Sequence, residues 1–421
     1  MPIKMSKSKQ HYSMSAVKTK TAINLTILAV ICGCLILLIG FGPRSAMGFF
    51  QLPMLQDTGW DRSTFALAMA IQNLAWGLGQ PVLGAISDRY GTWRVLALGA
   101  VVYTVGLVMM AGASSPFWLH VGGGVLVGFG VAACSFGVVL AALARLVSAE
   151  RRSVVFGLGT AAGSFGMFVY APVSRHLIEM LGWSDSLLVI AATMLLIPVL
   201  AIPLRGNATI STTVDNAFEQ SFRAALQEAF AHNSYLLLIA GFFVCGFQVA
   251  FITAHFPAYI SDLGLATKWA VVAISLIGFF NIIGSLAAGF IGQKYSKRIF
   301  LALIYIARSI IVTVFILTPA SPTSIVVFSV LMGFLWLSTV PPTNGLVALM
   351  FGTRYLGMLG GIVFFSHQVG SFLGVWLGGI LYDRTGSYNL VWWIGVVLGI
   401  FAAVVHWPIK EQAIERNKLH A

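Results

Sequence analysis

The sequence carries very little charge. Asp, Glu, Lys and Arg make up 9% of its 421 residues, 58% are hydrophobic, and the mean hydropathy is +0.90. Soluble domains carry about 25% charged residues, so these side chains cannot cover a 45.2 kDa globule in water. The composition therefore excludes a soluble domain and predicts that lipid surrounds most of the chain.

Motifs for phosphate binding and hydrolysis are also missing. The sequence has no GxxxxGK[ST] loop, no HExxH and no pair of carboxylates within an apolar run. These absences argue against an ATP-driven pump or an enzyme, and we expect no cofactor and no metal. The four cysteines, Cys32, Cys34, Cys134 and Cys245, all lie in apolar runs, so we interpret them as packing residues and expect no disulfide.

Long apolar runs dominate the sequence instead, and a membrane-spanning helix needs about 20 such residues. Twelve runs are long enough: 22–54, 63–86, 95–114, 117–143, 151–174, 185–204, 234–261, 268–291, 299–318, 323–349, 355–381 and 388–408. They predict an all-α membrane protein with twelve transmembrane helices. The first run is too long for a cleavable signal peptide and is interpreted as the first span.

The basic residues lie mainly on one side of this arrangement. Nineteen of the 25 Lys and Arg fall at the termini and in the loops on the N-terminal side, and four fall in the opposite loops. The positive-inside rule then places both termini in the cytoplasm. We expect a multi-pass protein of a cell (inner) membrane that acts as a monomer. The net charge of +12 lies in short clusters between spans, so no nucleic-acid partner is expected.

The two halves match at an offset of 205 residues. The matching pairs are Asp57/Asp262, Gly59/Gly264, Gly79/Gly284, Gly84/Gly289 and Gly128-Phe129/Gly333-Phe334. Six spans per half give both repeats the same orientation, which predicts two six-helix bundles around a central cavity.

The repeat divides the chain into five parts. These are an N-terminal cytoplasmic tail (1–21), a first bundle (22–204), a cytoplasmic linker (205–233), a second bundle (234–408) and a C-terminal cytoplasmic tail (409–421). The linker is expected to contain a short amphipathic helix, capped by Asp215 or Asn216 and followed by an apolar stripe that includes Phe222 and Phe230.

The loop after the second span reads Gly-Ala-Ile-Ser-Asp-Arg-Tyr-Gly-Thr-Trp-Arg over residues 84–94. It resembles the signature loop of the major facilitator superfamily, a glycine followed by Asp-Arg-x-Gly and basic residues. Trp93 replaces a second basic residue of that pattern. The resemblance implies the major facilitator fold and cytoplasmic charge contacts that break when the bundles rock. It assigns this gating role to Gly84, Asp88, Arg89, Gly91 and Arg94.

Two further segments resemble the monocarboxylate-transporter-like branch of that superfamily. They are Phe-Gly-Pro-Arg-Ser in span one, over residues 41–45, and His-Phe-Pro-Ala-Tyr in span seven, over residues 255–259. Many members of the branch carry a substrate-binding Arg in span eight, where this sequence has Ser285. The resemblance implies transport of a small organic solute and leaves its identity open.

Polar side chains within the spans are the candidate solute-binding residues. A buried Arg costs about 2.5–3.5 kcal/mol on insertion scales and usually has a function or a partner. Arg44 is expected to contact an anionic group of the solute, or else to reach the outer interface or pair with a polar neighbour. Arg308 is expected to bind solute or to bond carbonyls. The other candidates are Asn73, Tyr170, His255, Asn281, Asn344, His367 and Gln368.

None of the 13 acidic residues falls in the bilayer core, because even Asp185 lies at the outer end of the sixth span. Proton coupling would therefore require a His, an outer-edge acid such as Asp262, or a proton carried by the solute, and we expect His367 to contribute. The sequence thus predicts a secondary transporter working by alternating access, with proton-coupled uptake of a monocarboxylate or related organic anion. Uptake of a less charged heterocycle such as riboflavin is the alternative, and a non-transporting membrane sensor or channel is the alternative of another class.

Overall fold

The computed structural model describes residues 7–147, 149–205, 222–352 and 355–414. The side chains of several helical residues, including Asp88 and Arg89, lie outside the description. Every regular element in the described ranges is helical. A helix satisfies its backbone hydrogen bonds internally, which is what a chain in lipid requires.

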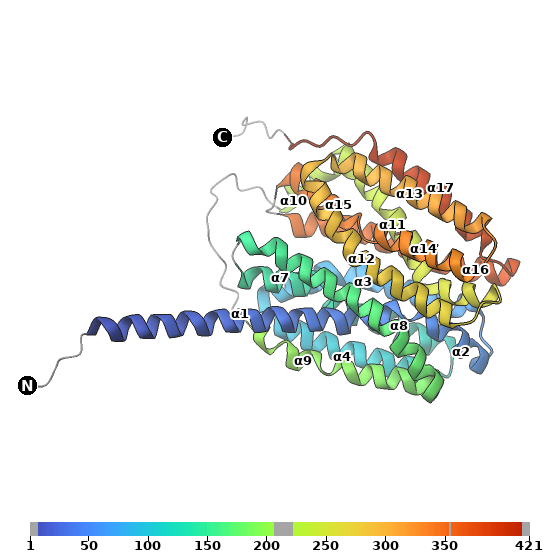
Figure 1. The fold of residues 1–421 in the computed structure, drawn as a ribbon, viewed down its shortest axis with the longest axis horizontal. Coiled ribbons are helices and arrows are strands. Elements are labelled where there is room, and N and C mark those ends of the chain that lie inside the picture. Colours follow the sequence, from blue (N-terminus) through green and yellow to red (C-terminus); the bar gives the residue numbers. More distant parts are fainter. Residues whose placement is uncertain (1–6, 148, 206–221, 353–354, 415–421) are drawn as a thin grey trace, which may run out of the picture.

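The first bundle contains the helices drawn in blue to green in Figure 1. They are α1 (Lys7–Ser45), α2 (Gly48–Thr58), α3 (Arg62–Tyr90), α4 (Thr92–Ala111), α5 (Pro116–Leu119), the π-helix η1 (His120–Leu126), α6 (Val127–Cys134), α7 (Phe136–Leu146), α8 (Ala149–Met194), α9 (Ile197–Leu200) and the 3₁₀-helix η2 (Ile202–Leu204).

The second bundle lies beside the first and is drawn in yellow to red in Figure 1. Its helices are α11 (Asn233–Asp262), α12 (Lys268–Lys294), α13 (Lys297–Leu317), α14 (Pro322–Leu335), α15 (Val340–Phe351), α16 (Leu356–Thr385) and α17 (Asn389–His406). The two bundles meet mainly where α3 contacts α16 and where α8 contacts α12.

Two faces of the helical body are distinguished below. The distal face carries the connections at 59–61, 112–115, 263–267, 318–321 and 386–388, together with the bend at Gly182. The proximal face carries the connections at 91, 231–232 and 295–296 and the segment after α17. The sequence predicts that the proximal face is cytoplasmic.

The structure confirms the all-helical fold with twelve spans. Ten segments of the described residues are long and apolar enough to cross a membrane. One of these ten segments, residues 157–200, contains two of the predicted spans. The helix α3, which is not among the ten, corresponds to the second predicted span and completes the twelve. Within α8 the backbone leaves the helical conformation at Gly182, whose φ of 79° lies in a region that L side chains rarely adopt. Two helical segments therefore meet at Gly182, inside the connection predicted at 175–184.

The spans are less regular than the sequence predicts. The first predicted span (22–54) is interrupted at Ala46–Met47, just after Pro43, because a proline ring within a helix removes one backbone hydrogen bond. The tenth (323–349) is interrupted between Leu335 and Val340. These two interruptions expose backbone groups inside the protein, and one of them is used by the polar residues described below.

The close helix contacts repeat at the offset of 205. A methyl group on Gly128 would lie 2.6 Å from the carbonyl oxygen of Gln72, and one on Gly333 would lie 3.0 Å from that of Ile277. Gln72 and Ile277 are themselves 205 residues apart. Small residues allow helix backbones to approach this closely in lipid. The repeat therefore appears in packing as well as in sequence.

The linker contains the expected short helix, α10 (Phe222–Phe230). Ala229 of the predicted stripe is buried and Leu226 packs against the core, whereas Phe230 is half exposed; Ala225, which lies outside the stripe, is also buried. The proposed caps Asp215 and Asn216 lie outside the described residues.

Candidate solute site and gates

Arg44 occupies the last turn of α1, just before the interruption of the first span. Its side chain is half buried, and Nη2 donates a hydrogen bond to Oδ1 of Asn73 in α3. The guanidinium also lies over the ring of Trp76, 4.6 Å from the centroid. Its buried Nε has no hydrogen-bond partner among the described residues. A guanidinium has five donor N–H groups, so Arg44 retains capacity for an acceptor such as a carboxylate.

A chain of hydrogen bonds continues from Asn73 into the second bundle. The backbone carbonyl of Asn73 accepts a bond of 3.1 Å from Nε2 of Gln368 in α16. Oε1 of Gln368 lies 2.9 Å from Nδ1 of His367. The structure thus brings together Arg44, Asn73, Gln368 and His367, four of the predicted site residues, although they come from both bundles.

This chain of hydrogen bonds also indicates which ring nitrogen of His367 carries a proton. An amide oxygen only accepts hydrogen bonds, so Nδ1 must donate to Oε1 of Gln368. Ser371 donates to the same oxygen at 3.4 Å, which supports this orientation of the amide. In the neutral ring Nε2 of His367 is therefore the acceptor nitrogen.

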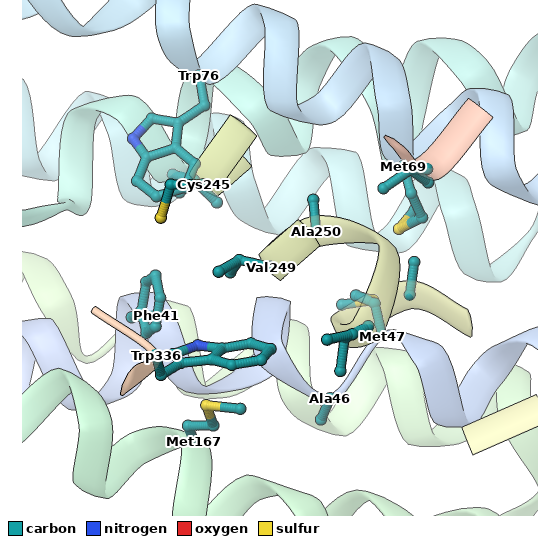
Figure 2. Packing of buried hydrophobic residues seen from close by; sticks show 14 of the residues in the cluster. Phe41, Ala46, Met47, Met69, Trp76, Met167, Cys245, Val249, Ala250 and Trp336 are labelled. Atoms are coloured by element: carbon teal, nitrogen blue, oxygen red, sulfur yellow. The ribbon is translucent and has the colours of Figure 1, made fainter. Parts of the chain in front are cut away.

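Aromatic side chains surround the guanidinium of Arg44. Phe41 lies 6.2 Å from Trp76 between ring centroids, and Trp76 lies 5.2 Å from Phe364 of the second bundle. Figure 2 shows Phe41 and Trp76 gathered with Trp336 where the bundles meet. Trp76 and Phe364 were not among the predicted site residues, because single aromatic residues are common in apolar spans.

A small cavity lies beside Arg44, between the bundles. Its volume of about 20 Å³ holds a group the size of a water molecule. Arg44, Gln72 and Asn73 line it from the first bundle, and Thr253 and Val375 line it from the second. The space fits the head of a solute rather than a whole one, so a larger solute needs the bundles to move apart.

Arg308 in α13 is fully buried and makes a different set of contacts. Nη2 donates to the carbonyl oxygens of Leu335 (2.6 Å) and Trp336, at the interruption of the tenth span. Nη1 donates to Oε1 of Gln248 at 3.3 Å and to Sγ of Cys245 at 3.4 Å. The carbonyl bonds correspond to the structural alternative that the sequence left open. Its described hydrogen-bond partners include no carboxylate.

Cys245 is packed in the core, as the sequence predicts, and it also contacts polar groups. It is buried, as a packing residue would be, but its sulfur also contacts Arg308 and lies 3.3 Å from Oγ1 of Thr339. The apolar neighbours of Cys245 in the sequence hid this role, because both polar partners come from other helices. The cysteines are free thiols.

His255 in α11 belongs to a separate cluster nearer the distal face. It is fully buried, with Nε2 2.8 Å from the carbonyl oxygen of Val375 and Nδ1 3.1 Å from the hydroxyl of Tyr388. Gln51 of the first bundle approaches the same Nδ1 at 3.5 Å. The structure therefore places His255 next to the distal contacts and outside the hydrogen-bonded chain that starts at Arg44.

The bundles are joined at the distal face by Arg62. Its guanidinium forms two hydrogen bonds of 2.6 and 2.7 Å with the carboxylate of Asp262 and a third of 2.9 Å with Tyr388. The carboxylate of Asp383 accepts bonds from the backbone N–H groups of Arg62 and Ser63, so it caps α3 from the other bundle. We call these five residues the distal latch.

The gating loop on the proximal face is tight. Only Gly91, with φ of 94°, separates α3 from α4, and Arg94 donates to the carbonyl of Tyr90 at 3.5 Å. A methyl group added at Gly84 would have no neighbour within 4 Å. The side chains of Asp88 and Arg89 lie outside the described residues, so their gating role stays a prediction.

The other predicted site residues are more scattered. Asn281 links α12 to the first bundle through Ser164 (3.0 Å) and also accepts a bond from Ser285. The ring of Tyr170 packs against Gly42, close to Arg44 in the chain. Asn344 is exposed on α15. The geometry does not bring these three into the chain that starts at Arg44.

Paired six-helix bundles that meet around polar side chains are an arrangement typical of membrane transporters. The sequence model of the Major Facilitator Superfamily matches residues 31–375 and 273–420. The chain therefore belongs to the Major Facilitator Superfamily, and its relatives are transporters rather than enzymes.

Individual relatives place it within that superfamily. The chain is 25% identical to the uncharacterized MFS-type transporter YcxA of Bacillus subtilis (strain 168) over 389 residues, which cover 90% of this chain and 94% of YcxA. It is 27% identical to monocarboxylate transporter 13 of Rattus norvegicus over 342 residues, covering 80% and 76% of the two chains. These similarities confirm the resemblance found in the sequence.

Solved structures share the fold. A bacterial homolog of the human lysosomal transporter Spinster, in an inward-facing and unoccupied conformation, matches with a TM-score of 0.70 at 13% identity. The match covers 91% of this chain and 96% of that one. The inward-facing and occupied form matches with a TM-score of 0.68 at 14% identity, over 90% and 95% of the two chains.

Proposed function

We propose that this protein carries a monocarboxylate or related organic anion across the membrane by alternating access, together with a proton. The observation that carries the proposal is the half-buried guanidinium of Arg44, which has an unpartnered Nε and borders a cavity lined by both bundles. A carboxylate is the group that best matches a guanidinium in charge and planar shape. The monocarboxylate transporters among its relatives support the same solute class.

The polar chain from Arg44 supports coupling between the bundles. A solute carboxylate bound to Arg44 would compete for the bond to Asn73, whose backbone also anchors Gln368. Gln368 in turn fixes the tautomer of His367. Anion binding in the first bundle can therefore influence a titratable group in the second.

The distal latch supports alternating access. A capping carboxylate contributes about 1 kcal/mol, and a guanidinium over an aromatic face contributes about 0.5–2 kcal/mol. The latch combines such a cap with an ion pair and the ring of Tyr382, 3.7 Å from the Arg62 guanidinium. Together these contacts contribute a few kcal/mol, which is comparable to the free-energy difference between two conformations that exchange. We propose that the latch holds the distal side closed and breaks when that side opens, and that the bundles move as the units 22–204 and 234–408.

Uptake by purified protein in liposomes tests the proposal. With L-lactate as probe, we expect Arg44→Ala to lose uptake and Arg44→Lys to retain part of it, because Lys keeps the charge but not the planar fork. A loss of about 2–3 kcal/mol corresponds to roughly 30–150-fold in uptake efficiency. Full activity of both variants would remove Arg44 as the anion contact. Arg175→Ala, at the distal surface, is the matched control.

The aromatic rings near Arg44 favour a second candidate. Phe41, Trp76 and Phe364 offer flat surfaces on which a heterocycle such as riboflavin could stack. A thermal-shift screen with lactate, pyruvate and riboflavin separates the two, because a ligand stabilises the folded state that binds it. Stabilisation by riboflavin alone, unaffected by Arg44→Ala, would replace the first proposal by the second.

A further inference from the structure

The hydrogen bonds of the buried His255 ring suit only its neutral form. Its Nε2 lies 2.8 Å from the carbonyl oxygen of Val375, and a carbonyl oxygen only accepts, so Nε2 carries the hydrogen. In a neutral imidazole the other nitrogen is then an acceptor. Two groups approach that nitrogen, Nδ1: the Tyr388 hydroxyl at 3.1 Å and Nε2 of Gln51 at 3.5 Å. Both can donate to it, so all these contacts are matched while the ring is uncharged.

Tyr388 joins this ring to the distal latch. Its oxygen accepts a hydrogen bond of 2.9 Å from Nη1 of Arg62, so its own hydrogen is directed at Nδ1 of His255. The same Nη1 donates to the carboxylate of Asp262 at 2.6 Å. Because Arg62 belongs to the first bundle and the other three residues to the second, two consecutive hydrogen bonds connect the ring to the contact that closes the distal side.

A proton on Nδ1 would disrupt this arrangement. The ring would present an N–H to two groups that now donate, and the Tyr388 hydrogen would lose its acceptor. Gln51 offers another acceptor, because its Oε1 is buried and has no hydrogen-bond partner in the described chain. Turning the amide would satisfy the new N–H but would still leave the Tyr388 hydrogen without its acceptor. The closed latch therefore favours the neutral ring in either orientation of the amide.

The charges around the ring act in the same direction. The titratable and charged groups near it are Tyr382, Tyr388, Arg62, Asp262 and Asp383. Both carboxylates are bonded to the start of α3, and the described hydrogen bonds of the ring include no carboxylate. An imidazolium would therefore add a second positive charge one side chain away from the Arg62 guanidinium. A buried charge without a partner is costly.

We propose that His255 is a proton-binding site that controls the distal latch: the neutral ring accompanies the closed latch, and the protonated ring accompanies the open one. This inference rests on the proposed gating role of the latch. Water that enters as the bundles separate gives a proton to Nδ1 and takes it back on closure. Because coupled equilibria are reciprocal, the state that excludes the proton is disfavoured when protons are abundant. Acidification of the distal side therefore favours the state that accepts solute from that side.

A distance measurement across the distal face tests the site without any solute. Cysteines replacing the exposed Met180 and Ala320, one in each bundle, carry spin labels on full-length protein in lipid nanodiscs. Between about pH 8 and about pH 5 we expect the ratio of longer to shorter distances to rise, by at most about tenfold per pH unit for one proton. His255→Gln should abolish the rise. His120→Gln is the matched control and should keep it, because that ring contacts the Thr64 carbonyl within the first bundle at 3.0 Å.

A second variant covers the case in which His255→Gln does not fold. Tyr388→Phe removes the hydroxyl between the ring and Arg62, so it should populate the longer distance at neutral pH and weaken the response to acid. The full wild-type response in either variant would overturn the proposal. So would a wild-type distance that is independent of pH or that shortens in acid.

Arg62→Gln separates this site from the latch on which it rests. It should populate the longer distance at every pH, because the bonds to Asp262 and Tyr388 are lost. Unchanged distances in Arg62→Gln would reject the latch and the proton site with it. A longer distance in Arg62→Gln, combined with no pH response in the wild type, would reject His255 alone and leave the proposed gating intact.

Discussion

The two intramembrane arginines show how one residue type acquires different roles. Arg308 is fully buried and its donors reach two carbonyls, an amide and a thiol. Arg44 is half buried, has one described hydrogen bond and keeps an unpartnered Nε beside a cavity. Arg308 therefore holds the second bundle together, whereas Arg44 is available to a ligand.

We expect lysine to distinguish these roles. Lys is a point charge without a planar fork, so Arg308→Lys cannot satisfy the same four partners. Breaking such a buried network costs about 3–5 kcal/mol, and the melting temperature in detergent should fall by several degrees. Arg44→Lys should melt close to wild type and change uptake instead. Equal melting temperatures for Arg308→Lys and wild type would contradict the structural role.

At the level of elements, the segment after α17 fastens the proximal face of the second bundle. Glu411 accepts hydrogen bonds from the Ser296 hydroxyl and from the backbone N–H of Arg298 (2.8 Å), so it caps the start of α13. The backbone N–H of Lys410 donates a hydrogen bond of 3.0 Å to Oγ of Ser234 at the start of α11. Residues 289–298 match the signature loop at the offset of 205 but have Gln293 in the position of Asp88, and Glu411 supplies a carboxylate near this segment from the chain after α17.

The cap makes stability depend on pH. Burial of the Glu411 carboxyl opposes ionisation, but its hydrogen bonds outweigh burial and hold the pKa of Glu411 below its usual value. A carboxyl with a depressed pKa stabilises the fold above its unfolded pKa of about 4.3, and this stabilisation is lost as pH falls through the folded pKa. We expect Glu411→Gln to lower the melting temperature at neutral pH and to flatten the fall at acidic pH. Parallel curves for variant and wild type would contradict this.

At the level of the whole molecule, the contacts between bundles determine which face opens. The distal latch joins α3 to the second bundle through Arg62, Asp262 and Asp383. Tyr388, which also belongs to the latch, connects Arg62 to the buried His255. The latch is therefore continuous with the interior, and weakening it should change the balance between closed and open distal sides.

Removing the guanidinium tests this balance. Arg62→Gln should favour the distal-open state by about 1–2 kcal/mol, a change of roughly 5–30-fold in its population. A cysteine replacing the buried Met69, which lines the cavity between the bundles, should then react faster with an impermeant maleimide. Arg175→Gln is the control, because its 2.7 Å ion pair with Glu179 lies within one helix. Identical labelling rates in both variants would exclude the latch.

The sequence by itself determined the fold class, the twelve spans and the repeat. A hydrophobic run long enough to cross a bilayer can satisfy its backbone only as a helix, so composition and length suffice. The offset of 205 predicted equivalent glycines, and the close contacts at Gly128 and Gly333 share that offset. Arg44, Asn73, His367 and Gln368 were also recognised, because polar groups are rare within spans.

Only the tertiary structure decided which of these groups meet. Cys245 and Arg308 lie 63 residues apart, and Arg62 and Asp262 lie 200 apart, so no local pattern connects either pair. Each contact depends on how two helices are rotated and how the bundles are docked. The hydrophobic pattern of a membrane span gives little information about how the helix is rotated, because both its lipid-facing and its protein-facing sides are apolar.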